Sequence, residues 1–253
     1  MQHAFAAAVA ALGKPCVLFL VHGGPLDTTQ ELALPAITGI VDAFYPGFDG
    51  AEAMAATLFG LNDNLGGKMA FTTYPASYVD TIKMSDMELD GPVGRSYRFY
   101  AGETVYPFGY GLSLATFALA PAGAAWPSNA TSFPTKSASA ALTYTLTVTN
   151  TGAVTGDEVI QAYFLPTATP AQPASRLRKQ LFEYRRVHLS AGGSAQVSFD
   201  VSSATLRMSD RATGNLVSTP GTFDLLFTNG VDLQVGARVT VTGEEVVVKT
   251  FPY

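Results

Sequence analysis

Carboxylates are the side chains of this sequence whose types and positions could support chemistry, as paired general acids and bases. Asp27 follows the turn Gly23-Gly24-Pro25, directly after the apolar run Val17–Val21. Because α/β proteins place ligand-binding groups at the carboxyl ends of strands, Asp27 is a candidate for substrate binding. Asp49 and Glu52 open a helical segment, where capping and the helix dipole already explain a carboxylate.

Five further acidic residues crowd one part of the sequence, namely Asp80, Asp86, Glu88, Asp90 and Glu103. Two of them could form a catalytic pair, but a solvated acidic loop is the favoured interpretation. A catalytic pair also needs a pocket that excludes water and raises the pKa of one partner. The sequence therefore names no catalytic residue.

Histidine and cysteine add little chemistry. The three histidines, His3, His22 and His188, are too scattered to predict a metal site. His22 lies at a strand end, where a structural role is favoured over a contact with a substrate. Cys16 is the only cysteine and lies in an apolar run, which is typical of a buried and inert thiol.

Composition excludes several classes of protein. The net charge of −5 gives no support to nucleic-acid binding. No apolar run approaches the roughly 20 residues that a membrane span needs. The basic residues Arg176, Arg178, Lys179, Arg185 and Arg186 are interpreted as an exposed strand edge and its preceding loop. No phosphate-binding loop, nucleophile elbow or CxxC motif is present, and no cofactor is expected.

The first 117 residues alternate helix and strand patterns. A helix is expected to end at Gly13, and apolar runs at 17–21 and 37–45 predict strands. Residues 50–60 have helical spacing and stop at Gly60, and the run 69–74 predicts another strand. Short connections between these elements favour a parallel α/β layer.

The second half has a period of two. Residues 118–138 are rich in Ala, Pro and Ser and predict a linker between domains. Asn129 begins a glycosylation sequon in this linker, which is used only if the protein enters the secretory pathway. Runs typical of strands then follow at 141–150, 157–166, 179–189, 195–201, 222–228 and 237–248. This series predicts an all-β sandwich over residues 139–253.

Residues 95–117, RSYRFYAGETVYPFGYGLSLATF, join the two halves and hold seven aromatic side chains. Exposed aromatic rings stack on sugars, so Tyr97 is a candidate at the rim of a binding site. Turns at Pro107, Gly109 and Gly111 instead favour a structural joint whose aromatic side chains pack between the domains.

Several segments resemble one known family. The first half contains GKPCVLFLVHGGPLD (13–27), YPGFDGAEAMAATLFG (45–60), NLGGKMAFTTYPASYVD (64–80) and the joint. These are similar to the α/β-sandwich domain of glycoside hydrolase family 3, in its β-xylosidase and β-glucosidase branch. The segments 150–166 and 179–194 resemble the immunoglobulin-like, fibronectin type III-like domain that ends those enzymes. The fold class is therefore a partial parallel α/β sandwich followed by a β-sandwich.

The resemblance implies hydrolysis of O-glycosyl bonds by two carboxylates, about 5–5.5 Å apart in retaining enzymes. It places the Asp nucleophile on an N-terminal barrel, which takes about 250 residues, and the acid/base Glu on a loop that aligns before residue 1. Both groups are expected outside this chain. The implied partner is a β-linked oligosaccharide or aryl glycoside, bound once a barrel completes the site, and the implied location is extracellular or in the cell wall.

The sequence departs from the family pattern at several positions. His22 stands for Ser, Lys68 for Arg, Asp90 for an Arg, and Leu65, Ala70 and Val93 for Pro. A sugar contact made by that Arg in relatives is not expected here. Three hypotheses remain: a C-terminal portion of a glycosidase, which is favoured, a non-catalytic module that binds carbohydrate or protein, and a small independent enzyme. Under the first, the isolated chain is expected to be poorly soluble and inactive, with residues 139–253 folding alone.

Overall fold

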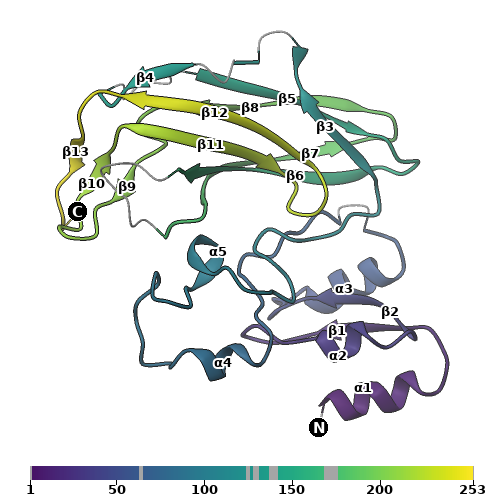
Figure 1. Ribbon diagram of the computed structural model, residues 1–253. Helices are drawn as coiled ribbons and strands as arrows, with labels where there is room; N and C mark the ends of the chain where they lie inside the picture. The colour runs from purple at the N-terminus through teal and green to yellow at the C-terminus, as the bar shows by residue number, and fades with distance from the viewer. Residues whose placement is uncertain are drawn as a thin grey trace.

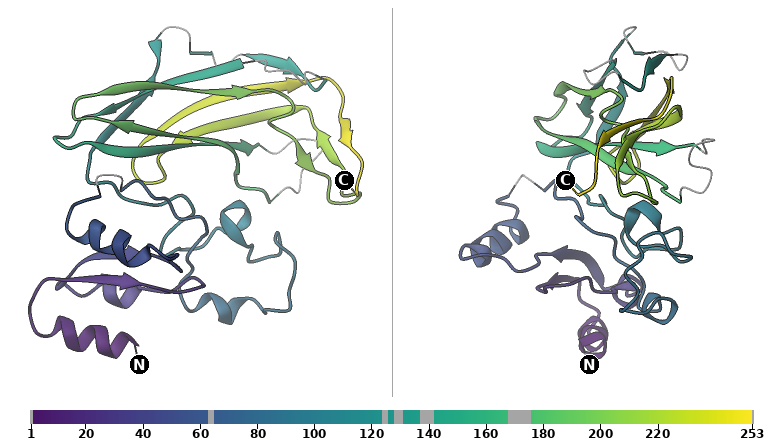
Figure 2. Two further views of the ribbon diagram at one scale, coloured as in Figure 1. Left: turned by 180° about the vertical axis from the view of Figure 1, so that it is seen from behind. Right: turned by 90° about the vertical axis from the view of Figure 1, so that its left-hand side faces the viewer.

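The computed structural model describes residues 2–62, 65–123, 126–127, 131–136, 142–167 and 176–252. Figure 1 shows a β-sandwich built from the second half of the chain lying against a smaller α/β part built from the first half. The side view in Figure 2 places helix α1 (Gln2–Ala10) at the end of the molecule farthest from the sandwich. The predicted order of an α/β part followed by a β-sandwich is confirmed.

The α/β part is built on a parallel pair of strands, β1 (Cys16–Leu20) and β2 (Ile37–Asp42). Strand β1 is a continuous apolar run, as expected for a parallel sheet, whereas β2 also contains Thr38, Gly39 and Asp42. Helix α3 (Gly50–Leu58) follows β2 and is followed by Gly60 at φ +69°, a left-handed conformation that favours glycine. The helix–strand–strand–helix order predicted for this segment is confirmed.

The strand predicted at residues 69–74 is wrong. This segment is extended but forms only an isolated bridge, between Thr73 and Tyr106. Its backbone bonds run to the joint instead, because the Met69 amide donates to the Tyr110 carbonyl and the Gly109 amide donates to the Met69 carbonyl. Three short helices also occur in this part: α2 (Thr29–Leu32), α4 (Tyr78–Thr81) and α5 (Ser96–Phe99).

The sandwich consists of a five-stranded sheet in the order β4-β12-β11-β6-β7 and a three-stranded sheet in the order β3-β5-β8. Its strands are β3 (Phe117–Pro121), β4 (Ser132–Pro134), β5 (Leu142–Asn150), β6 (Gly156–Pro166), β7 (Gln180–Leu189), β8 (Ser194–Val201), β11 (Gly221–Thr228) and β12 (Gln234–Thr242). A small sheet of β9 (Met208–Ser209), β10 (Leu216–Ser218) and β13 (Val246–Lys249) closes one end. The six predicted runs are all strands, and the last run is divided into β12 and β13.

The segment 118–138, expected to be a linker, carries sandwich structure instead. Strand β3 pairs antiparallel with β5, and β4 pairs in parallel with β12. Phe133 is buried in the core, and Trp126 packs against it. The Ala, Pro and Ser content hides these strands because each is only three to five residues long. Asn129, the predicted glycosylation acceptor, lies outside the described residues.

The core of the molecule lies between the two large sheets. Its fully buried aromatic residues come from both sheets: Tyr144, Phe164, Phe199, Phe223 and Phe227. The alternation of β5 explains this arrangement, because Tyr144, Leu146 and Val148 are completely buried while the threonines between them lie on the other face. Burial raises the pKa of Tyr144 to about 12, so its phenol stays neutral.

Strand β6 differs from the other strands because both of its faces are buried from Gly156 to Phe164. One face, with Ile160, Ala162 and Phe164, points into the core. The opposite face, which includes Gln161 and Tyr163, is covered by the joint of residues 95–117. The sandwich therefore offers β6 as the main platform on which the α/β part packs.

Candidate functional site

Asp27 lies in the loop between β1 and α2, and its carboxylate holds two loops together. One oxygen accepts bonds from the Thr29 amide at 2.8 Å and the Thr29 hydroxyl at 2.5 Å, and the other accepts from the Ala76 amide at 2.7 Å. Burial raises the pKa of Asp27, but the hydrogen bonds from Thr29 and Ala76 outweigh it and hold the pKa below its ordinary value. Asp27 is therefore ionised at neutral pH and suits an acceptor rather than a proton donor.

His22 is buried at the end of β1, where its Nε2 lies 3.0 Å from the carboxylate of Asp42 at the end of β2. The ring also packs on Phe44, whose φ of +51° is unusual for a large side chain. The Asp42 carboxylate supports that backbone by accepting a bond from the Phe44 amide at 3.1 Å. His22 thus ties together two strand ends, and its Nε2 contacts Asp42 rather than Asp27.

Tyr97 lies between the α/β part and the sandwich. Its ring stacks on Phe108 with centroids 4.3 Å apart and meets Tyr163 of β6 edge-on at 5.9 Å. Its hydroxyl oxygen accepts bonds from the Leu181 amide at 3.2 Å and from the Gln180 side chain at 3.4 Å. These contacts use both the face and the hydroxyl of Tyr97 within the protein, in keeping with the structural joint.

The acidic residues before the joint are used in contacts with the sandwich. Asp90 pairs with Arg211 at 2.8 Å, and the Arg176 side chain donates to the Asp90 carbonyl at 3.2 Å. Glu88 lies 3.7 Å from the same Arg211. Asp90 therefore anchors this loop to the sandwich. Within the described part of the chain, no group of three or more His, Cys, Asp or Glu side chains is arranged to hold a metal ion.

A groove of about 1270 Å³ runs along β1. It is lined by α1, by every residue of β1 and by the loop around Pro75, and its surface is mainly apolar. Among the described strands β1 pairs only with β2, so its other edge has no strand beside it. Val17 and Val21 of this edge region are about half exposed. Such an open apolar edge is typical of a surface that another polypeptide covers.

One end of the groove is acidic. Glu31 of α2 is 4% exposed, and one of its oxygens lies 2.5 Å from Nδ1 of His3. The second carboxylate oxygen of Glu31 is buried and has no hydrogen-bond partner in the described structure. A buried acceptor without a partner is costly, so this end of the groove is suited to a hydrogen-bond donor from outside the described residues.

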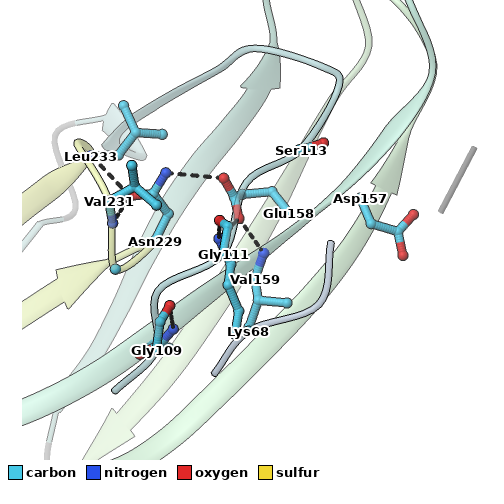
Figure 3. Close-up of polar contacts among 12 residues, drawn as sticks. Lys68, Gly109, Gly111, Ser113, Asp157, Glu158, Val159, Asn229, Val231 and Leu233 are labelled. Atoms are coloured by element: carbon cyan, nitrogen blue, oxygen red, sulfur yellow. Dashed lines mark hydrogen bonds and ion pairs between the residues drawn. The ribbon is translucent and has the colours of Figure 1, made fainter. Parts of the chain in front are cut away.

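A buried polar network lies where the joint meets the sandwich, and sequence reasoning did not find it (Figure 3). Lys68 Nζ lies 2.9 Å from Glu158 Oε1 and donates to the Gly111 carbonyl at 2.9 Å. Glu158 in turn accepts a bond from the Asn229 amide at 3.0 Å. The only signal in the sequence was an acidic residue at the start of an otherwise apolar strand.

Asp157 lies next to this network but points away from it, as Figure 3 shows. It accepts bonds from His188, at 2.5 Å, and from Arg186. Burial raises the pKa of Asp157, but the bonds and positive charges of His188 and Arg186 outweigh burial, so the pKa lies below its ordinary value. A lowered carboxylate pKa stabilises the fold above the unfolded-state value of about 3.9, and this stability is lost as the pH falls through the lower folded-state value.

Asp157→Asn is therefore expected to lower the free energy of unfolding by about 1.5 kcal/mol at pH 7. The difference from wild type should begin to shrink below about pH 4, where the unfolded chain takes up a proton at Asp157, and should vanish once the pH falls below the lowered pKa of folded Asp157. Urea unfolding at pH 7, 5 and 3 measures this. Asp224→Asn, which removes an exposed pair with Arg238, is the control and should change little. An Asp157 effect that is the same at pH 3 and pH 7 would contradict the assignment.

Two protein-family models together match most of the chain. Residues 1–114 match the glycosyl hydrolase family 3 C-terminal domain, and residues 158–231 match the fibronectin type III-like domain. A probable exo-1,4-beta-xylosidase of Aspergillus fumigatus is 34% identical over 95% of this chain. Beta-D-xylosidase 1 of Arabidopsis thaliana is 33% identical over 74% of it. The chain spans about a third of the length of these relatives, 32% and 27% respectively.

A solved structure shares the arrangement of both parts. A family 3 exo-beta-xylosidase in complex with a xylobiose aziridine activity-based probe superposes on the whole chain with a TM-score of 0.85 at 26% identity. The chain covers 34% of that protein. Sequence, domain order and fold agree, and the chain therefore belongs to glycoside hydrolase family 3, of which it carries the C-terminal α/β and fibronectin type III-like portion.

Proposed function

We propose that this chain is the non-catalytic C-terminal portion of a β-glycosidase that hydrolyses β-linked xylosides or glucosides. The groove along β1 is the observation that carries the proposal, because an apolar strand edge of this size requires a polypeptide cover. The curated relatives are about three times as long as this chain and are named as xylosidases. The remaining part of such an enzyme is a suitable cover.

The carboxylates of this chain support the same proposal by what they already contact. Asp27 holds Thr29 and Ala76, Asp90 pairs with Arg211, and Asp157 pairs with Arg186 and His188. Each carboxylate is used as an acceptor or ion-pair partner in a structural contact, whereas a glycosidase also needs a carboxyl group that donates a proton. The nucleophile and the general acid/base of the proposed reaction belong to the rest of the enzyme.

The 253-residue chain alone is expected to show no turnover of aryl β-xylosides or β-glucosides. A chimera in which this chain replaces the aligned third of the Aspergillus fumigatus relative is expected to hydrolyse the aryl β-xyloside. Turnover by the chain alone would contradict the proposal that both catalytic carboxylates lie outside this chain. A folded chimera without activity would contradict the proposed function, and binding of insoluble xylan by the chain alone would favour a carbohydrate-binding module instead.

Two matched substitutions connect the groove with this activity. Val17→Asp puts a charge on the open edge of β1 and is expected to abolish the activity of the chimera, because a desolvated charge would oppose docking. Val247→Asp, at a similarly exposed position on β13, is the control and should leave the activity unchanged. Equal losses in the two variants would remove the groove from the proposal. An extracellular or cell-wall location is part of the same proposal, and secretion of the full enzyme from its native host tests it.

A further inference from the structure

The ion pair between Lys68 and Glu158 is buried where the two parts of the molecule meet. The side chain of Lys68 is 10% exposed and that of Glu158 is 4% exposed. Lys68 belongs to the α/β part, in the segment after α3, whereas Glu158 is the third residue of strand β6. Removing one partner of a buried pair leaves the other charge buried without a counter-charge, which strongly destabilises the surrounding structure.

Glu158 connects the ion pair with Lys68 to two further groups of the sandwich. Its Oε1 atom accepts from the Val159 amide at 2.7 Å, and its Oε2 atom accepts from the side-chain amide of Asn229 at 3.0 Å. Each carboxylate oxygen is therefore directed by a separate partner, and with Lys68 the two oxygens have three (Figure 3). The carboxylate cannot rotate without losing at least one of these bonds.

Asn229 fixes the turn between β11 and β12. Its side-chain oxygen accepts bonds from the backbone amides of Val231 at 3.0 Å, Asp232 at 3.1 Å and Leu233 at 2.9 Å. Because three amides point at one atom, that atom must be the oxygen, and the nitrogen must face Glu158. The orientation of the Asn229 side chain and the conformation of the turn therefore depend on each other.

We propose that Lys68, Glu158 and Asn229 form a polar relay through which the α/β part sets the conformation of the β11–β12 turn of the sandwich. Lys68 is a positioning residue here, since its polar contacts are with Glu158 and Gly111 and not with residues 231–233. Docking of the α/β part brings Lys68 to Glu158, Glu158 directs the Asn229 amide, and the Asn229 oxygen orders the turn. The conformation of the turn then depends on whether the α/β part is packed correctly on the sandwich.

Hydrogen exchange in the full 253-residue chain tests the relay residue by residue. Lys68→Met is expected to speed exchange of the Val231, Asp232 and Leu233 amides by about tenfold or more, and Lys68→Arg is expected to restore protection. Arg211→Met removes a different ion pair between the same two parts and is the control. Its exchange at the turn should stay within twofold of wild type.

A second variant keeps the test valid if Lys68→Met does not fold. Lys68→Met combined with Glu158→Leu leaves no unpaired buried charge, and such apolar replacements are well tolerated. The fold should persist, but the side-chain nitrogen of Asn229 loses Glu158 as an acceptor and is left with the Asp232 carboxylate, at 3.0 Å, within the turn itself. The turn should therefore still exchange about tenfold faster. Wild-type protection of the turn in this double variant, or in a folded Lys68→Met, would overturn the relay. Equal acceleration in Arg211→Met would reduce it to general loosening of the interface.

Discussion

A fragment that begins at residue 139 is expected not to fold cooperatively, whereas a fragment of residues 115–253 is expected to do so. The difference lies in β3 and β4, which the shorter fragment lacks. Strand β3 covers the edge of β5 from Leu146 to Asn150, and β4 covers an edge of β12. Without them the sandwich has two new open edges and an incomplete core.

The apolar side chains lost with these strands explain the size of the effect. Phe117, Leu119, Trp126 and Phe133 all pack into the core cluster. Their burial is worth about 5–10 kcal/mol together, which is comparable with the whole stability of a domain, about 5–15 kcal/mol. Urea unfolding followed by far-UV circular dichroism compares the two fragments. A cooperative transition of the 139–253 fragment at the same midpoint as the longer one would contradict the assignment of β3 and β4 to the core.

Gly111→Ala is expected to lower the free energy of unfolding by about 3 kcal/mol, at the upper end for added volume in a packed site. A Cβ atom at Gly111 would overlap the carbonyl oxygen of Gly67, and a backbone atom cannot move aside as a flexible side chain can. The carbonyl oxygen of Gly111 also accepts a hydrogen bond from Lys68, so a shift of the Gly111 backbone would displace the buried Lys68–Glu158 ion pair as well.

Gly67→Ala is the matched control for this change. A Cβ atom at Gly67 meets nothing within 4 Å, although the residue lies in the same backbone contact. Neither residue has a positive φ, so conformational strain does not separate the two variants. Thermal unfolding of the two variants side by side measures the difference. Equal destabilisation by both would show that helical or loop propensity, and not backbone contact, decides the effect.

The sequence predicted well those features that repeat along the chain. The alternation in residues 141–150 places Tyr144, Leu146 and Val148 in the core, as the structure confirms. The extended segment 69–74 looked like a strand because its composition suits one, but composition does not say whether a neighbouring strand exists. Strands β3 and β4 were hidden for the opposite reason, since a strand of three to five residues has too little period to stand out from Ala, Pro and Ser.

The contacts between distant segments could not be predicted. Lys68 and Glu158 are separated by 90 positions, and neither one carries a local pattern that names the other. The structure places His22 just after β1, Asp27 in the loop between β1 and α2, and Tyr97 in the joint. Their partners come from elsewhere in the chain. Asp27 meets Ala76, His22 meets Asp42, and Tyr97 meets Leu181. Spacing identifies the elements, whereas the contacts between elements follow from three-dimensional packing.

Trp126 gives the molecule a built-in optical probe. It is the single tryptophan of the chain, and its ring meets Tyr144 and Phe227 edge-on at 4.9 and 5.7 Å. Both neighbours are completely buried in the sandwich. Tryptophan emission therefore follows the closure of the two sheets upon each other and is blind to the parallel strands. A change in tryptophan emission during unfolding therefore reports the melting of the sandwich, without a contribution from the groove along β1.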